Sequence, residues 1–560
     1  MKKLLIYTII VVCGNVSLFS QQIDLTKPKD MVTKDKWLSI NGGFSASSIY
    51  YTGNEPNMRD PFNYFLSGNV NFNIMGLIDM PFSFNFTNSG ANYAYPTMPN
   101  RLSLHPKYKF LTGHIGDVSM NFSPYTLNGH QFTGVGLDVE PNNPFKCSIM
   151  YGRLLKAVEF GEGRNEVTAA YQRMGTGIHL RYEKSRYRLA ASLFAAKDKE
   201  NSLLWKPDSL LIFPKQNLAG SFTAGFELLK NMQLTAEYGI SHINHDIRLK
   251  TDEKEQTYHA FKMMLNYTFL NNTLGIGYER IDPEYRTLGA YYFNNDLENI
   301  TLNYARPFFN NKATIALSGG VQRDNLKKES ESETRRFVFS ADAAYSASDK
   351  LNFSAAYTTF QTHMNLRSQF DYINELTPYD NLDTLNFTQL SQNVNFNTVY
   401  IFGQKERQQQ LNLFLSYQEA ADKQGDIIPD GASSLFFNTS LGYGLQLAPQ
   451  GLNINFSLNT TNSRMDKQEM FIAGPSLGIT AQLFNKKVSS GIVGSYNLNY
   501  LAGTKQNEVW NLRFNASYVL LKKHSLAVSA IYRNNASFNQ STIQARSNGL
   551  TLNASYSYKF

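Results

Sequence analysis

The sequence is poor in cysteine and has no long apolar run. Its 560 residues include only two cysteines, Cys13 and Cys147. If Cys13 leaves with an export signal, the mature chain keeps one cysteine and cannot form an internal disulfide. Beyond the N-terminus, no segment approaches the roughly 18 consecutive apolar residues of a membrane-spanning helix. These absences argue against a helical membrane protein and against a disulfide-stabilised fold.

Charge is also scarce, whereas aromatic residues are abundant. Charged residues make up 18% of the chain, compared with roughly 25% in soluble domains. The net charge of +8 comes without any Lys/Arg-rich run, so nucleic acid is not indicated as a partner. The chain has 39 Phe and 33 Tyr but only 3 Trp, and its mean hydropathy is slightly polar. This composition suits a surface that alternates between lipid and water.

The N-terminus has the pattern of an export signal. Lys2 and Lys3 precede a short apolar run, and Ser20 precedes Gln21 at a plausible cleavage site. We therefore expect a signal peptide over residues 1–20, cleaved near Ser20-Gln21, and a short periplasmic segment over 21–36. Two alternatives stay open: a buried first strand, and a lipoprotein anchored at Cys13, for which the preceding valine is a poor fit.

The C-terminus shows the clearest alternation of apolar and polar residues. Side chains alternate across a strand, so residues 550–560 have one polar face, with Thr551, Asn553 and Ser555 on it. The apolar face consists of Leu550, Leu552, Ala554, Tyr556, Tyr558 and Phe560. We predict that this segment is the final membrane strand and that Tyr556, Tyr558 and Phe560 are its assembly signal, since aromatics gather where an interface girdle belongs.

The same alternation recurs along the chain, as in residues 232–240, 261–267, 452–459, 492–500 and 511–520. These segments match the roughly 9–11 residues that a tilted strand needs to cross a bilayer. The predicted fold is all-β: a single large transmembrane antiparallel β-barrel over residues 37–560. We expect about 24 strands, within about 22–26 and an even number. The pattern is irregular between residues 80 and 165. A soluble β-solenoid or a series of β-sandwiches is the alternative.

Short and long connections are expected to alternate along the barrel. Short turns are expected at 230–231, 271–272, 310–311, 347–349, 449–450, 485–486 and 522–523. Longer polar loops are expected at about 245–256, 282–297, 324–334, 362–389, 421–432, 463–470, 501–508 and 537–546. Outer-membrane barrels have short periplasmic turns and long external loops. Counting back from a C-terminal strand that ends in the periplasm puts all the short turns on that side.

Residues 107–145 differ from the regular strands. Glycine within a strand marks a bulge, a bend or a close backbone approach, and proline is confined to edges and turns. One hypothesis is that this segment bends into the lumen and narrows it, because a barrel of this width needs a closure. The residues expected at such a constriction are Gly113, Gly116, Asp117, Pro124, Tyr125, Gly129 and His130. The alternative is an ordinary hairpin with glycine kinks.

Two external loops combine aromatic and acidic residues. The loop over 362–389 is a candidate binding face for protein, sugar or calcium, through Asp371, Tyr372, Glu375, Tyr379, Asp380 and Asp383. The loop over 281–296 has a similar composition. The alternative is that these loops pack on one another as a lid over the barrel mouth.

Signals for an enzyme are poor, and we expect no catalytic site, no cofactor and no metal. The sequence contains no phosphate loop, zinc spacing or EF-hand pattern. A remote alternative is an outer-membrane hydrolase that uses Ser123 and His130.

The Lys-Lys signal, the Asn- and Tyr-rich strands and the terminal Tyr556, Tyr558 and Phe560 together resemble outer-membrane barrels of Bacteroidota of an uncharacterised family. The resemblance is to a class of protein and implies no substrate. It implies outer-membrane lipid and the barrel-assembly machinery as partners. The sequence has no plug domain or TonB-binding segment, so we do not expect a TonB-dependent receptor.

Two functions therefore compete. The first is a transport or secretion channel, gated by internal loops or by a plug partner. The second is a surface scaffold or adhesin-anchoring barrel, whose external loops bind a secreted or surface protein. The predicted location for both is the cell outer membrane.

Overall fold

The computed structural model describes residues 37–54, 61–88, 100–159, 169–205, 211–249, 255–291, 294–323, 326–327, 335–359, 361–364, 388–421, 433–465, 468–539 and 542–560. The expected signal peptide (1–20) and N-terminal segment (21–36) lie outside these residues. So does the candidate binding face with Asp371, Tyr372, Glu375, Tyr379, Asp380 and Asp383. Within the described ranges, no helix is long and apolar enough to cross a membrane.

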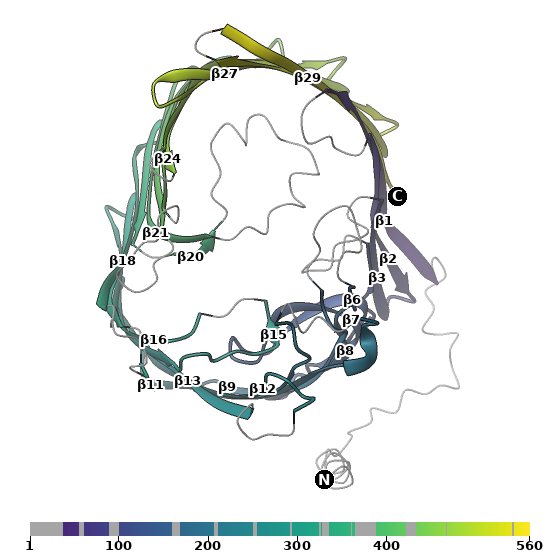
Figure 1. Cartoon of the computed structure of the whole chain (residues 1–560), viewed down its shortest axis with the longest axis vertical. Helices are drawn as coiled ribbons and strands as arrows, with labels where there is room; N and C mark the ends of the chain where they lie inside the picture. The colour runs from purple at the N-terminus through teal and green to yellow at the C-terminus, as the bar shows by residue number, and fades with distance from the viewer. Residues whose placement is uncertain are drawn as a thin grey trace.

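In the described part of the chain, 26 strands form one closed antiparallel β-barrel, seen end-on as a ring in Figure 1. This confirms the predicted fold class, and the number is even, as bacterial barrels require. Its first half consists of β1 (Leu38–Gly53), β2 (Phe62–Ile74), β3 (Ile78–Thr87), β4 (Arg101–Leu104) with β5 (Lys107–Tyr108), β6 (Leu111–Asn121), β7 (Leu127–Val139), β8 (Phe145–Leu155), β9 (Arg173–Lys184), β10 (Tyr187–Asp198), β11 (Gln216–Leu229), β12 (Met232–Asn244), β13 (Glu255–Phe269) and β14 (Asn272–Ile281).

The second half consists of β16 (Leu297–Phe308), β17 (Ala313–Arg323), β18 (Arg335–Ser348), β19 (Leu351–Thr358), β21 (Thr388–Gln404), β22 (Arg407–Ala421), β23 (Ser433–Leu447), β24 (Leu452–Met465), β25 (Gln468–Leu483), β26 (Val488–Leu501), β27 (Thr504–Leu520), β28 (His524–Asn539) and β29 (Thr542–Lys559). The short segments β4 and β5 together take one place in the wall, since both pair with β3 and β6. Two other short strands, β15 (Gly289–Ala290) and β20 (Gln361–Met364), are attached to β7 and β21.

The barrel closes between its first and last strands. β1 pairs with β29 from Gly43 opposite Lys559 to Gly53 opposite Gly549. Beyond that ladder, the amide of Phe560 donates to the carbonyl of Gly42 at 3.0 Å, and the amide of Gly42 donates back at 3.3 Å. The predicted final strand is therefore also the strand that closes the ring and leaves no free edge.

The alternation read from the sequence separates the two faces of the wall. On β24, the outward side chains Phe456 and Leu458 are exposed. The opposite face carries polar side chains that bond to neighbouring strands, as Ser457 bonds Ser476 at 2.7 Å. The same holds for β29, where Leu552 is exposed on the outer face. The barrel thus has an apolar exterior and a polar interior, as lipid outside and water inside require.

The predicted short turns all lie at one rim. Several use asparagine with positive φ, as at Asn231 (φ 67°), Asn271 (φ 65°) and Asn485 (φ 54°). Asparagine tolerates this left-handed conformation because its side chain bonds the local backbone. Five further turns at this rim, at residues 75–77, 109–110, 140–144, 185–186 and 405–406, were not predicted.

Three predicted polar loops were wrong. Most of 463–470, 501–508 and 537–546 belongs to strands, since β24 extends to Met465, β27 begins at Thr504 and β28 extends to Asn539. These strands are longer than a bilayer needs, and their far ends are rich in polar residues. Polarity alone therefore did not distinguish a loop from a strand that continues beyond the membrane.

Candidate functional site

Two connections at the rim opposite the short turns pack against the inner wall. One is the β6–β7 turn with the start of β7, residues 122–131, and the other is the β14–β16 connection, residues 282–291. Together they are called the inner module here. Figure 1 shows β15, which belongs to the second connection, inside the ring beside β6 and β7. The two segments join where Gly289 and Ala290 of β15 pair in parallel with Leu127 to Gly129 of β7.

The β6–β7 turn is compact and internally bonded. The amides of Phe122 and Ser123 both donate to the carbonyl of Leu127, at 2.9 and 3.3 Å. The amide of Tyr125 donates to the hydroxyl of Ser123 at 3.0 Å. Gly129 then has φ +66°, a conformation that favours glycine. Pro124 is exposed at the tip, whereas Tyr125 is buried.

Two carboxylates of the wall hold this turn. Ser123 donates its hydroxyl to Glu237 of β12, and Tyr125 donates its phenol to Glu279 of β14 at 3.2 Å. Strands β8 to β11 stand between β7 and β12 along the wall. The turn must therefore leave the wall and pass along its inner side to reach these carboxylates.

A glycine on β12 makes room for the turn. A Cβ added to Gly239 would lie 2.6 Å from Cβ and 2.8 Å from Cγ of Tyr125, closer than unbonded carbons pack. Glycine in a strand commonly marks such a close approach. Gly177 of β9 has the same relation to the ring of Phe122, at 2.7 Å. Glycines in the wall strands β9 and β12 thus provide the space that the turn occupies.

The second connection is anchored through its backbone and hydroxyls. The Tyr285 phenol donates to the Tyr125 carbonyl at 2.8 Å, and Thr287 donates to the Thr126 carbonyl at 2.6 Å. The amide of Leu288 donates to Asn217 of β11 at 3.0 Å. Because these donors and acceptors are buried, leaving one unpaired would cost about 1–3 kcal/mol. The network therefore fixes one arrangement of the two segments.

An apolar core fills the space between the inner module and the wall. Its members from the module include Tyr125, Leu127 and Tyr285. Its members from the wall are Val118, Met120, Phe132, Met150, Leu154, Phe194, Ala196, Ile243, Tyr258, Ala260, Ile281 and Leu297. Inward side chains of a wide barrel normally face water, so an apolar patch of this size requires a cover. The inner module provides that cover.

Burial controls the ionisation of the tyrosines in the module. It raises the pKa of Tyr125 far above its ordinary value, and the nearby Glu279 and Glu237 raise it further. Burial likewise raises the pKa of Tyr285, with Glu237 adding to the effect, and it raises that of Tyr291. All three phenols therefore stay protonated, and able to donate, at neutral pH.

The residues predicted at a constriction divide into two groups. Pro124, Tyr125, Gly129 and His130 lie in the inner module. Gly113, Gly116 and Asp117 lie instead in the wall strand β6, where Gly116 (φ +96°) would bring a Cβ within 2.1 Å of the Leu102 carbonyl. Asp117 accepts the Leu102 amide at 3.0 Å and the Thr133 hydroxyl at 2.6 Å. These three residues shape the contact between β6 and its neighbours.

Sequence reasoning missed the wall residues that hold the module. Glu237, Gly239 and Glu279 occur in regular strands, where a single inward acid or glycine gives no signal of a partner. The segment 281–296 was singled out, but as an external loop. Its buried Tyr285 and Thr287 place the described part of this loop against the β6–β7 turn.

Ser123 and His130, the remote hydrolase candidates, have other partners. The hydroxyl of Ser123 is bonded to Glu237. His130 donates from Nδ1 to the carbonyl of Gln131 at 2.7 Å and stacks on Tyr291, with ring centres 4.2 Å apart. Both residues thus serve contacts of the inner module.

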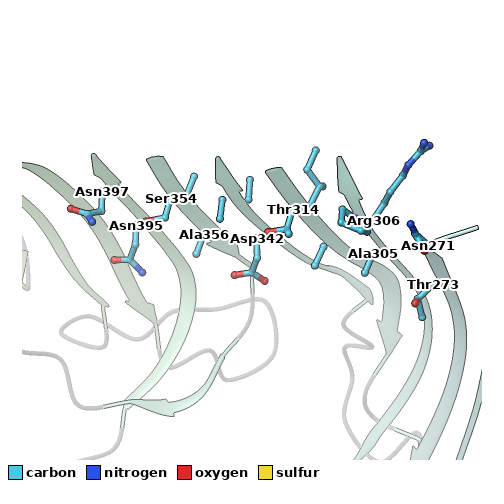
Figure 2. A pocket seen from close by; sticks show the side chains of 16 residues that line it. Asn271, Thr273, Ala305, Arg306, Thr314, Asp342, Ser354, Ala356, Asn395 and Asn397 are labelled. Atoms are coloured by element: carbon cyan, nitrogen blue, oxygen red, sulfur yellow. The ribbon is translucent and has the colours of Figure 1, made fainter. Parts of the chain in front are cut away.

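Beyond the module, the wall of β14–β21 is lined by small side chains. Figure 2 shows this recess, with Asp342, Ser354, Ala356 and Asn395 on neighbouring strands. Asp342 is exposed. Small residues on the inward positions leave space in the lumen along this sector, in contrast to the sector that the inner module covers.

The fold and the polar interior define the chain as a large β-barrel of outer-membrane type. No protein-family model and no curated protein matches it. Similar solved structures include the P pilus usher PapC translocation pore (10% identity, 93% of this chain, 99% of that chain, TM-score 0.37). They also include the copper transporter OprC (9%, 93% and 80%, 0.39) and the FrpB iron transporter of Neisseria meningitidis, F3-3 variant (11%, 95% and 83%, 0.39).

With TM-scores below 0.5, these similarities carry no information about the inner module or its role. A Bacteroidota source, and the expectation that the chain is not a TonB-dependent receptor, stay predictions.

Proposed function

We propose that the protein is an outer-membrane transport channel whose lumen is narrowed from one side by its own inner module. The observation that carries this proposal is the double attachment of the module to the wall, through the Tyr125 phenol to Glu279 of β14 and through the Leu288 amide to Asn217 of β11. A barrel of this many strands encloses a wide lumen, and comparably large barrels are plugged. A module anchored in this way closes part of the opening without a separate domain.

The inner face of β24, beyond the sector that the inner module covers, supports a polar substrate. Inward positions of β24 carry Asn453, Asn455, Ser457, Asn459 and Thr461. Several of them bond across strands, as Thr461 bonds Asn438 at 2.7 Å. Amide and hydroxyl groups both donate and accept hydrogen bonds. Such a surface exchanges hydrogen bonds with neutral polar solutes as readily as with water.

Conductance of the purified barrel in a planar bilayer tests the proposal. The wild type is expected to conduct with small unitary steps. Tyr125→Ala combined with Tyr285→Ala should loosen the module and enlarge or destabilise those steps. The matched control is Tyr400→Ala with Tyr532→Ala, two tyrosines exposed on the outer wall. Absence of conductance in folded wild type and folded double variant alike would contradict a channel. Equal steps in both double variants would contradict the constriction.

A surface scaffold is the second candidate, favoured by the length of the last strands. β27 has 17 residues and β29 has 18, more than the roughly 9–11 that cross a bilayer. The extended part carries Trp510 beside Tyr496, with ring centres 4.5 Å apart and ring planes tilted by 40°, and Lys505 over Phe538 at 4.0 Å. Trp510→Ala separates the candidates, because it should weaken attachment of a surface partner and leave conductance unchanged.

A further inference from the structure

Beside the inner module, Arg173 and Lys215 meet the carboxylate of Asp198 at one rim, and a third cation acts on Lys215. Arg173 begins β9, Asp198 ends β10, and Lys215 immediately precedes β11. Arg173 and Asp198 are register partners, and the backbones of Asp198 and Lys215 bond at 2.8 Å. The third cation, Arg286, belongs to the inner module, between the buried Tyr285 and Thr287. Strands and module together therefore bring these charges to one place.

The carboxylate of Asp198 already accepts three hydrogen bonds. It accepts Nε and Nη2 of Arg173 at 2.7 and 3.0 Å, and the backbone amide of Lys215 at 2.9 Å. Its side chain is 2% exposed. Asp198 is thus the ion-pair partner of Arg173, and one carboxylate carries the negative charge set against Arg173 and Lys215.

Positive charge is in excess around Lys215. Of the charged groups that act on this lysine, Arg173 and Arg286 are cations and Asp198 is the anion. Burial lowers the pKa of Lys215, and the two arginines lower it further. A half-buried lysine with two positive neighbours is costly unless an anion joins it, because buried charges are normally paired.

The cluster faces the lumen. Side chains two residues apart lie on the same face of a strand, and Lys215 is two residues before Asn217. Asn217 bonds the amide of Leu288 in the inner module, so its face is the inner one. Arg286 is exposed, and its carbonyl is held by the hydroxyl of Ser241. Because Arg286 is exposed, its guanidinium is available to a solute within the barrel.

We propose that Lys215, Arg173 and Arg286 form a binding subsite for a soluble oxyanion, a phosphate, sulfate or carboxylate group, at the edge of the inner module. Guanidinium and ammonium groups are the side chains that bind such oxyanions. The subsite would select acidic solutes near the module. Binding can be measured whether or not the barrel conducts, so its test is independent of the channel proposal.

The test is a calorimetric titration with inorganic pyrophosphate. The purified full-length barrel is held in detergent that is free of lipopolysaccharide. The wild type should bind saturably. Lys215→Met and Arg286→Met, which keep an aliphatic stem, should each weaken binding by about tenfold or more. The control is Lys312→Met, an exposed lysine in the turn after β16 at the opposite rim, whose affinity should stay within about twofold.

Thermal unfolding of the same variants separates binding from folding. Because Lys215→Met removes a half-buried charge with positive neighbours, the unfolding midpoint without pyrophosphate should be unchanged or higher while binding is weakened. No saturable binding by the wild type would overturn the subsite. Equal weakening by Lys312→Met would also overturn it, since it would show general attraction to a basic protein.

Discussion

At the scale of residues, the inner module depends on a few positions where the wall yields space and receives hydrogen bonds. Gly239 allows Tyr125 to pack so closely against β12 that an added methyl group would clash with its side chain. Glu237 and Glu279 then accept the hydroxyls of Ser123 and Tyr125. Close packing and hydrogen bonding occur at the same positions. Single substitutions here should therefore loosen the inner module, whereas similar substitutions elsewhere in the barrel should not.

Replacing Gly239 with alanine should loosen the β6–β7 turn. The added Cβ would lie 2.6 Å from Cβ of Tyr125, and overpacking of this kind costs about 1–3 kcal/mol. Gly494→Ala is the control, since its nearest neighbour would be Cδ1 of Leu512 at 3.9 Å. Limited proteolysis of the folded barrel should cut Gly239→Ala faster near residues 122–126. Identical cleavage patterns for the two variants would refute this packing account.

The module should also loosen at alkaline pH. Folding raises the pKa of Tyr125 and Tyr285 above the ordinary 10.0. The folded state therefore holds these protons more tightly, and the stability they contribute is complete below about pH 10 and declines as the pH rises above it. Unfolding midpoints measured from about pH 8 to about pH 12 should fall for the wild type.

Tyr125→Phe with Tyr285→Phe removes the two buried phenols and should flatten this alkaline decline. The double variant should also be less stable at neutral pH, by about 1–3 kcal/mol, because the Tyr125 carbonyl loses a buried donor. Tyr532→Phe, on the exposed outer face, serves as the control. An alkaline decline of equal steepness in all three proteins would count against the assignment.

At the scale of elements, strand β29 closes the ring by pairing with β1. Phe560, which follows β29, exchanges two further backbone hydrogen bonds with Gly42. The ring of Phe560 lies 5.5 Å from that of Tyr558. A defect at this end is therefore a defect of closure, which exposes a strand edge.

Deletion of Phe560, or exchange of Tyr558 and Phe560 for aspartate, should abolish insertion. The deletion removes the terminal bonds to Gly42, and the exchange replaces the aromatic assembly signal with charge on the lipid-facing side of the strand. Ser557→Ala, on the inward face, is the control. The measurement is the heat-modifiable band in outer-membrane fractions. A normal amount of that band in the deletion variant would disprove the assembly role.

The β14–β16 connection has the composition of an external loop, but its described part packs against the inner wall. Its aromatic and acidic residues suit an external binding loop. Tyr285, Thr287 and Leu288 instead bond to the β6–β7 turn and to β11. The difference comes from residues far away in the sequence, Asn217 and Thr126 among them.

At the scale of the whole molecule, cohesion comes from the closed ladder of strands. Cys147, the cysteine of the described residues, is not part of a disulfide there, and the ring closes through backbone bonds of β1 with β29. Every strand in a closed ring has two neighbours, so no edge remains from which unfolding could start. Covalent cross-links are not required for such a structure.

A reducing agent should therefore leave the barrel unchanged. The temperature at which the heat-modifiable band shifts should be the same with and without dithiothreitol, and the same for Cys147→Ser. A lower temperature in dithiothreitol would reveal a disulfide. If the temperature is lower for Cys147→Ser as well, that disulfide would join Cys147 to a second copy of the chain.

The sequence alone determined the class of fold and which face of each regular strand is apolar. The period-two alternation over segments such as 452–459 and 550–560 is a local property, set by the water on one face and lipid on the other. Asparagine-rich turns such as 485–486 are local too, because they depend on the φ that a residue tolerates. Both signals lie within about ten residues, so both could be recognised without the structure.

Only the tertiary structure decided what stands inside the barrel. The seat of Tyr125 is built by Gly239 and Glu279, more than a hundred residues away, and nothing in their own strands indicates it. The excess charge at Lys215 likewise appears only when β9, β10, β11 and the inner module meet. A repeating alternation specifies which face each residue takes, but long-range packing decides which residues share the interior.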